Sequence, residues 1–327
     1  MKTHPIQRRR ITQALLASLV AVGLPSAALA QDAPAKILVG FPAGGSFDTI
    51  ARVLAEKLKT EFNRPVLVEN KSGAGGRIAV ETLKAAPNDG SVVMLGPDAL
   101  RSLYPFTFKK LNYDPIKDLV PVGTVSEFAF AMASGAEPRV DNLAEFVTWA
   151  KKNPAQANYG IPARGAPHHF FGMVLGDAIG VKMLDVPFQG SAPMASALMG
   201  GHISSSIDVL SSLVESHKSG KLKVLAVSSE QRDPQLPDVP TFAEQGYPSI
   251  TGMGFNALYA PAGTPANVVL TWNKALANVL AMPDVKARLQ TMGFHPVGRS
   301  PEELAARGAQ SAKRWEPVIK ASGFTAD

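Results

Sequence analysis

Two glycine-rich turns carry the strongest chemical signal in this sequence: FPAGGSFD at positions 41–48 and NKSGAGG at positions 70–76. Each follows a short apolar, strand-like run and precedes a helix-like run. Glycine lets a backbone approach a ligand closely, and the first N–H groups of a helix have no partner inside the helix. Together with the helix dipole, such groups bind anions. Either turn alone is equally typical of an ordinary strand-to-helix connection, but the pair predicts a cradle for a small carboxylate or phosphate.

The motifs of the main enzyme classes are missing from the chain. It has no cysteine, no G-x-S-x-G nucleophile elbow and no G-x-x-x-x-G-K-[ST] phosphate loop. The glycines at 73–76 do not complete the dinucleotide fingerprint, because Ile78 stands where its third glycine belongs. Asp48 and Asp208 are conceivable as an acid–base pair, but an aspartate at a helix start is more typical of a residue favoured by the dipole. We therefore predict a binding protein and not an enzyme.

The histidines do not form a metal-binding pattern. His168 and His169 are adjacent, so they do not readily face one ion from one helix, and His202, His217 and His295 lack ligand spacing. We therefore predict neither a metal nor a cofactor.

The first 30 residues read as a secretory signal peptide. Arg8–Arg10 form a positive start, 11–24 an apolar stretch, and Ala28–Ala30 a small-residue cleavage site. The absence of cysteine excludes disulfides and a lipid-anchored cysteine. The sequence therefore predicts a soluble protein exported to the periplasm.

The charge balance changes when the signal peptide is removed. The full chain has 33 Lys and Arg against 27 Asp and Glu, and four of the basic residues lie in the first 30 positions, which leaves 29 against 27. A net charge of +2 without a basic cluster does not favour nucleic-acid binding. The remaining length is typical of two lobes.

The alternation of apolar runs with helical periodicity predicts an α/β fold. Ser46 is expected to cap the first helix, and Ser300, Pro301 and Glu303 form a capping box for the last one. The other expected elements are strands 66–68, 92–95, 158–161, 183–187, 203–207 (followed by Asp208) and 222–227, and helices 77–86 and 143–152 with two more through Leu175 and Leu198.

Two stretches, 120–133 and 251–260, are expected to cross between the lobes. This predicts a first lobe of residues 31–130 plus 256–327 and a second lobe of residues 131–255. Two lobes joined by a double crossing form a hinge, which is how binding proteins close on a solute.

Six segments resemble those of one known family and occur in its order over nearly the whole chain after residue 30. They read ILVGFPAGGSFDTIARVLAEKL, RPVLVENKSGAGG, LNYDPIKDLVPVG, VPFQGSAPMASALMGGHI, KLKVLAVSSEQRDPQLPDVPTFAEQGYP and APAGTPANVV. Each motif is weak by itself, and six in order are specific. The chain is similar to the periplasmic solute receptors of tripartite tricarboxylate transporters, also called Bug proteins.

The resemblance implies a two-lobed periplasmic binding fold, type II-like, with a hinge of two crossing strands. It implies a small carboxylate ligand on which no chemistry is performed. The implied partners are membrane transporter subunits; a sensor protein that signals to a membrane kinase is an open alternative, because either partner would dock on the closed lobes. We expect a monomer, since the lobes must close.

The resemblance also implies the binding positions. In the family, the two glycine-rich loops of the first lobe hold one ligand carboxylate, partly through ordered waters, and second-lobe loops face them. The implied ligand-binding positions here are Ala43, Gly44, Gly45, Ser46, Phe47, Asp48, Ser72, Gly73, Ala74, Gly75, Gly76, Arg164, Gly165, Ala166, His168, His169, Phe188, Gln189, Gly190 and Asp208.

Several positions depart from the family pattern. Phe47 replaces a threonine or small residue, and hydroxyl residues are usual near Ala166 and His168. The planar fork of Arg164 suits a distal carboxylate. With Phe188, these residues favour an aromatic mono- or dicarboxylate over citrate. The alternative, in which both phenylalanines pack in the core and Arg164 is a solvated loop residue, stays open.

Overall fold

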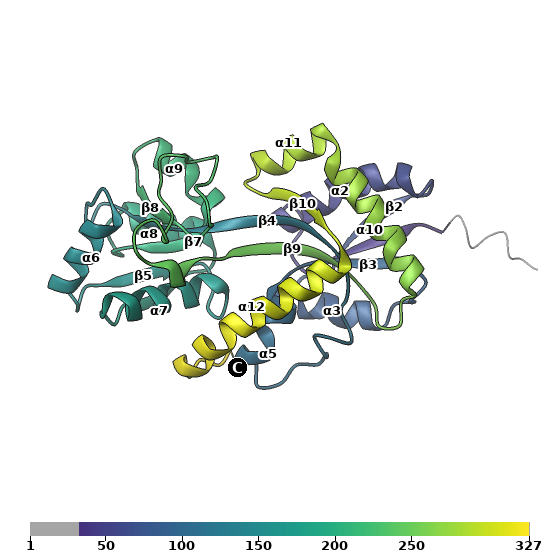
Figure 1. The fold of residues 1–327 in the computed structure, drawn as a ribbon, viewed down its shortest axis with the longest axis horizontal. Helices are drawn as coiled ribbons and strands as arrows, with labels where there is room; N and C mark the ends of the chain where they lie inside the picture. Colours follow the sequence, from purple (N-terminus) through teal and green to yellow (C-terminus); the bar gives the residue numbers. More distant parts are fainter. Residues whose placement is uncertain (1–32, 327) are drawn as a thin grey trace, which may run out of the picture.

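The protein is described by a computed structural model over residues 33–326, so the predicted signal peptide lies outside the described residues. Figure 1 shows two bodies joined by two long strands. These strands are β4 (Val120–Ser134) and β9 (Met253–Ala260), which pair antiparallel. They match the two predicted crossings and form the hinge of a two-lobed α/β fold.

The first lobe surrounds the parallel strands β1 (Ala35–Val39), β2 (Val66–Asn70) and β3 (Val92–Pro97). Its other elements are α2 (Ser46–Glu61), the 3-10 turn η1 (Ala74–Gly76), α3 (Arg77–Lys84), α4 (Ala99–Ser102), α5 (Tyr104–Thr107), α10 (Ala266–Ala281), α11 (Pro283–Thr291) and β10 (His295–Arg299).

The second lobe surrounds the parallel strands β5 (Asn158–Ile161), β6 (Leu184–Pro187) and β7 (Ser206–Val209). Its other elements are α6 (Leu143–Lys152), α7 (Pro167–Ile179), α8 (Ser191–Met199), η2 (Leu210–Ser212), α9 (Val214–Lys218), β8 (Lys223–Val227) and η3 (Pro248–Ile250). The residue limits of the lobes, 31–130 plus 256–327 and 131–255, stay a prediction.

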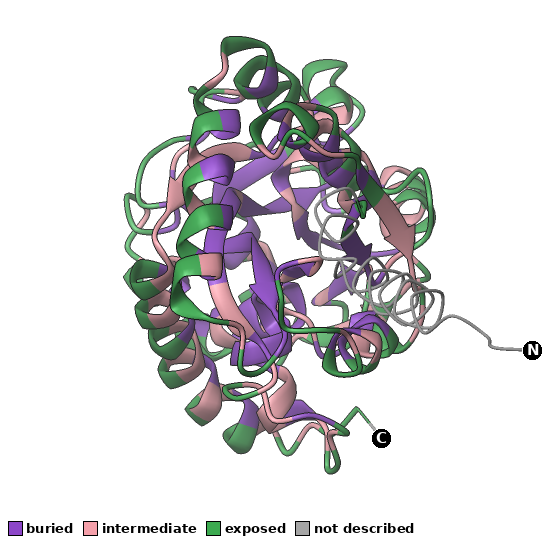
Figure 2. Ribbon diagram, turned by 90° about the vertical axis from the view of Figure 1, so that its right-hand side faces the viewer, coloured by how far each residue is buried: buried purple, intermediate pink, exposed green. Residues whose placement is uncertain are grey.

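One continuous sheet passes through both lobes. Its strand order is β2-β1-β3-β9-β4-β7-β5-β6, and β8 and β10 also pair with β4. In Figure 2 the strands are mostly buried, whereas the helices expose their outer faces. The reason is visible in α2, where Ile50, Leu54 and Leu58 form one apolar face and are fully buried.

The last helix, α12 (Pro301–Ser322), contacts α4 in the first lobe and α7 in the second (Figure 1). Its predicted capping box is confirmed: the Ser300 hydroxyl accepts from the Glu303 N–H at 3.2 Å, and the Glu303 carboxylate accepts from the Ser300 N–H at 2.8 Å. The predicted helix 143–152 is confirmed as α6, which Asn142 caps.

Two local predictions were wrong. The N-cap of α2 is Gly45 and not Ser46, and it makes no side-chain capping bond. Strand β7 begins at Ser206 and not at residue 203, because the Asn158 side chain accepts the Ser204 N–H at 2.8 Å in place of a ladder bond. Asp208 therefore lies inside β7 and not after it.

Candidate functional site

The first glycine-rich loop connects β1 to α2 and is exposed from Pro42 to Ser46. Gly44 adopts φ +82°, and its N–H donates to the Asp48 carboxylate at 2.9 Å. Arg52 donates to the same Asp48 oxygen at 2.9 Å. This charged hydrogen bond, with that from Gly44, lowers the pKa of Asp48 to about 2. Asp48 is buried, so in this structure its carboxylate fixes the conformation of the loop through its hydrogen bond from Gly44.

The N–H groups of Ser46 and Phe47 at the start of α2 have no hydrogen-bond partner among the described residues. The first backbone N–H groups of a helix remain unbonded in this way when no side chain caps the N-terminus. The loop therefore presents backbone donors at the positive end of a 16-residue helix, which suits an oxyanion.

The second glycine-rich loop connects β2 to α3 through four successive residues with positive φ, from Gly73 to Gly76. Three of the four are glycines, which adopt such angles readily, and Ala74 is the exception at φ +48°. The Tyr104 hydroxyl donates to the Gly75 carbonyl at 2.9 Å and fixes the loop from the α5 side. Ser72, Ala74 and Gly75 are exposed.

The two loops lie directly against each other. A Cβ atom on Gly40 would lie 2.5 Å from the Gly76 Cα atom, so these backbones are in contact. The Asn70 side chain also donates to the Phe41 carbonyl at 3.1 Å, and the Lys71 N–H to the Val39 carbonyl at 2.7 Å. The two loops thus form a single backbone surface.

Phe47 is half-buried and stacks on Phe41, with ring centroids 4.4 Å apart, while it packs against the first-lobe core. Phe188 is also half-buried and packs against a second-lobe core. Both rings therefore have a packing role in this structure, which is the alternative that the sequence left open.

In the second lobe, Arg164 is exposed but already paired. Its guanidinium contacts the Asp185 carboxylate at 2.7 and 2.8 Å. The histidines beside it are buried: His168 bonds the Ala163 carbonyl, and burial lowers its pKa to about 4. His169 accepts the Gly165 N–H at 3.3 Å. These histidines support the 164–169 loop as neutral groups, and Ala166 is the N-cap of α7.

The remaining second-lobe positions lie directly after β6 and within β7. The Phe188 and Gly190 N–H groups donate to the carbonyls of Ile161 and Pro162, which ties the 188–190 turn to the neighbouring loop, and Gln189 is exposed. Asp208 is 1% exposed, and one of its oxygens has no hydrogen-bond partner. Burial raises its pKa to about 6, although the Ser191 hydroxyl and the Val209 N–H oppose this rise.

The structure therefore gathers the predicted positions into two groups, one in each lobe. Between residues 33 and 326, no hydrogen bond, ion pair or ring contact joins positions 43–48 and 72–76 to the second-lobe positions.

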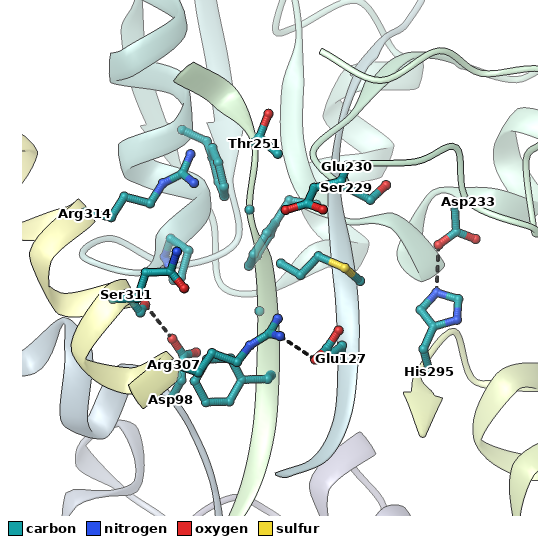
Figure 3. Close-up of a pocket in the computed structure, with 18 of the residues that line it drawn as sticks. Asp98, Glu127, Ser229, Glu230, Asp233, Thr251, His295, Arg307, Ser311 and Arg314 are labelled. Carbon is teal, nitrogen blue, oxygen red and sulfur yellow. Dashed lines mark hydrogen bonds and ion pairs between the residues drawn. The ribbon is translucent and has the colours of Figure 1, made fainter. Parts of the chain in front are cut away.

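A separate cavity of about 680 Å³ lies at the hinge, and the motifs did not reveal it. Figure 3 shows side chains from α12, from β4 and β9, and from the 229–234 loop around it. No position of the two glycine-rich loops lines this cavity, and the second-lobe loop 164–169 reaches it only through Pro167. The only sequence signal was the spacing of Arg307, Ser311 and Arg314, which places three polar residues on one helix face.

Among residues 33–326, no group of three or more His, Asp or Glu side chains is arranged to hold a metal ion. No helix in this range is both long and apolar enough to cross a bilayer.

Comparison with known proteins places the chain in a family. Residues 50–324 match the TctC model, described as the tripartite tricarboxylate transporter family receptor. Protein BugT of Bordetella pertussis is 29% identical over 295 residues, which is 89% of each chain.

Two similar solved structures come from Rhodopseudomonas palustris. MatC with bound malate is 29% identical, with a TM-score of 0.74 over 88% of this chain and 98% of that one. Rpa4515 with adipate is 28% identical, with a TM-score of 0.79 over 89% of this chain and 98% of that one. The chain belongs to the TctC, or Bug, family of periplasmic solute-binding receptors, which are not enzymes.

Proposed function

We propose that this receptor captures a small carboxylate between its lobes. One observation carries the proposal: two glycine-rich loops are joined backbone to backbone and present unpaired N–H groups at a helix N-terminus. Such donors bind a carboxylate without a buried charge opposite it, and bridging waters weaken the contact little. The relatives with bound malate and adipate hold ligands of this class.

In the proposed mechanism, the first-lobe loops bind one carboxylate, and the second-lobe loops 164–169 and 188–190 with Asp208 contact the rest of the solute. Rotation about β4 and β9 then brings the two groups together. In the periplasm, the closed form is recognised by the membrane subunits of a tripartite transporter. A sensor protein is the alternative partner.

An aromatic carboxylate is the narrower form of this proposal. Phe47 and Phe188 both keep part of their surface exposed, so each still has an edge for a ring. However, one face of Phe47 is taken by Phe41, and Arg164 is paired with Asp185. Aliphatic and aromatic ligands therefore have to be compared directly.

The experiment is a thermal-shift screen followed by calorimetry on residues 31–327. The panel pairs malate, succinate, adipate and citrate with benzoate, nicotinate and terephthalate at matched ionic strength. A ligand that binds only the folded state raises the melting temperature. Binding of one carboxylate, recovered chemically unchanged, supports the proposal, and the best ligand decides between the aliphatic and aromatic forms. No binding by any of them contradicts it.

Gly45→Val tests the loop itself. Gly45 has an ordinary φ of −74°, and an added Cβ meets only the Pro42 carbonyl, at 3.2 Å. The variant should fold, yet block approach to the N–H groups and abolish binding. Gly308→Val is a matched control, because no heavy atom lies within 4 Å of its added Cβ. Normal affinity in Gly45→Val would remove the loop from the site.

A further inference from the structure

The hinge cavity contains one guanidinium without an acidic partner. Arg314 extends from α12 into the cavity (Figure 3). Its one hydrogen bond among the described residues is from Nη2 to the Ser249 carbonyl, at 2.8 Å, and no carboxylate lies within ion-pair distance. A guanidinium has five N–H donors, so most of those of Arg314 are unused.

Arg314 is held in place by packing. Its guanidinium lies 5.6 Å from the ring centroid of Phe171 and 5.3 Å from that of Trp315. A Cβ atom on Gly252 would lie 2.9 Å from Nη1, so the group rests against the hinge backbone. A charge removed from water is normally paired. The Arg314 guanidinium is partly buried, fixed in position and without an acidic partner among the described residues.

Two of the other lining arginines have acidic neighbours. Glu127 accepts from Arg299 at 3.0 Å and from Arg307 at 2.7 Å. Burial raises the pKa of Asp98 to about 6, and the nearby charge of Arg307 opposes this rise.

Two more lining charges are paired. Asp233 pairs with His295 at 2.8 Å, and Arg232 pairs with Glu244 at 3.0 Å. Glu230 also lines the cavity and is exposed, with no ion pair among the described residues. Among the lining arginines, Arg314 is therefore the one without an acidic partner in the part of the chain that the structure describes.

Two further features of the cavity favour an anion. Ser229 lines it and is only 7% exposed, and its buried hydroxyl has no hydrogen-bond partner among the described residues. Pro167, the first residue of the 13-residue helix α7, also lines it, so the positive end of that dipole lies at its wall.

We propose that the hinge cavity is an oxyanion site, in which Arg314 binds a carboxylate or phosphate group and Ser229 supplies a second donor. The site is distinct from the glycine-rich loops. The oxyanion has two conceivable sources: a free anion, or the distal carboxylate of the captured solute. The second source alone rests on the proposed function.

The test uses Trp315 as a local probe. The chain has three tryptophans, so labelling with 5-fluorotryptophan gives three ¹⁹F resonances that single Trp→Phe variants assign. Inorganic phosphate and adipate are titrated separately, against chloride at equal ionic strength. A saturable shift of the Trp315 resonance with phosphate identifies a free-anion site, and a shift with adipate alone identifies the distal carboxylate. Either result supports the proposal.

Arg314→Gln should lower the affinity for the anion that shifts the Trp315 resonance by about tenfold or more, as expected for a lost charged hydrogen bond. Arg314→Lys should recover part of this affinity. Arg232→Gln is the matched control, since this arginine lines the same cavity but is already paired. It should change affinity less than about twofold.

Two outcomes overturn the proposal: a Trp315 resonance that moves with neither anion, or equal affinity in Arg314→Gln and the parent protein. Failure here is distinguishable from failure of the carboxylate cradle. Calorimetry on Gly45→Val reports the cradle alone, because Gly45 does not line the hinge cavity.

Discussion

Gly75 offers the sharpest test of how the second glycine-rich loop is built. It adopts φ +65°, and an added Cβ would lie 2.5 Å from the Tyr104 hydroxyl oxygen. Gly75→Ala therefore has two costs. The left-handed backbone costs about 1–2 kcal/mol for a residue with a Cβ, and displacing Tyr104 removes a hydrogen bond worth about 1 kcal/mol.

The sum is a loss of about 2–3 kcal/mol in the free energy of unfolding, below the 5–15 kcal/mol typical of a domain. The variant should therefore fold. Because Tyr104 no longer fixes the Gly75 carbonyl, the loop donors move, and carboxylate affinity should fall about tenfold or more. Gly75→Val, with a larger side chain, should abolish binding.

Gly220→Ala is the matched control, since Gly220 has φ +70° with no heavy atom within 4 Å of an added Cβ. It carries the backbone cost without the contact. Denaturant unfolding should separate the two alanine variants by about 1 kcal/mol, and calorimetry should show normal affinity in Gly220→Ala. Equal destabilisation by both, with unchanged affinity in Gly75→Ala, would refute this account of the loop.

Four further outcomes are expected. Phe47→Thr removes a stacked ring, so it should lower stability and, if the ligand is aromatic, weaken ligand binding by about 1–2 kcal/mol. Calorimetry with an aliphatic ligand as comparison separates the two effects. Unchanged affinity for the aromatic ligand would place Phe47 outside the site. The pKa of Asp48 is lowered from 3.8 to about 2, so its stabilising contribution is complete above pH 4 and is lost between about pH 4 and 2; the stability difference from Asp48→Asn should shrink over that range in acid-unfolding curves. The pKa of Asp208 is raised from 3.8 to about 6, so the folded state binds the proton more tightly, and stability should fall as the pH rises from about 4 through 6. In Asp208→Asn, this part of the pH dependence should vanish from denaturant titrations. If it persists, burial of Asp208 is not its cause. Arg164→Gln breaks an exposed ion pair, so unfolding should show a stability change below about 1 kcal/mol; a loss of carboxylate affinity above about tenfold by calorimetry would mean that Arg164 leaves Asp185 to bind the ligand.

Local sequence signals predicted much of the architecture. The capping box of α12 and the bounds of α6 follow from residues a few positions apart, and the structure confirms both. The two crossing strands were also predictable, because they separate two similar sets of alternating elements.

The site was less predictable, because its geometry depends on contacts between distant segments. Arg164 pairs with Asp185, 21 positions away, and Tyr104 bonds Gly75, 29 positions away. Neither contact leaves a periodic pattern. Arg314 is a similar case, since its lack of an acidic partner is a property of the packed hinge and not of the helix sequence.

Strand β4 has a consequence for how the protein unfolds. Its 15 residues pair with β9 and β10 in one half and with β7 and β8 in the other, so a single strand belongs to both sheet regions. Neither lobe can unfold without removing an interior strand from the sheet of the other. The two lobes should therefore unfold together in one calorimetric transition, and chain segments on either side of the hinge should share the slowest hydrogen exchange.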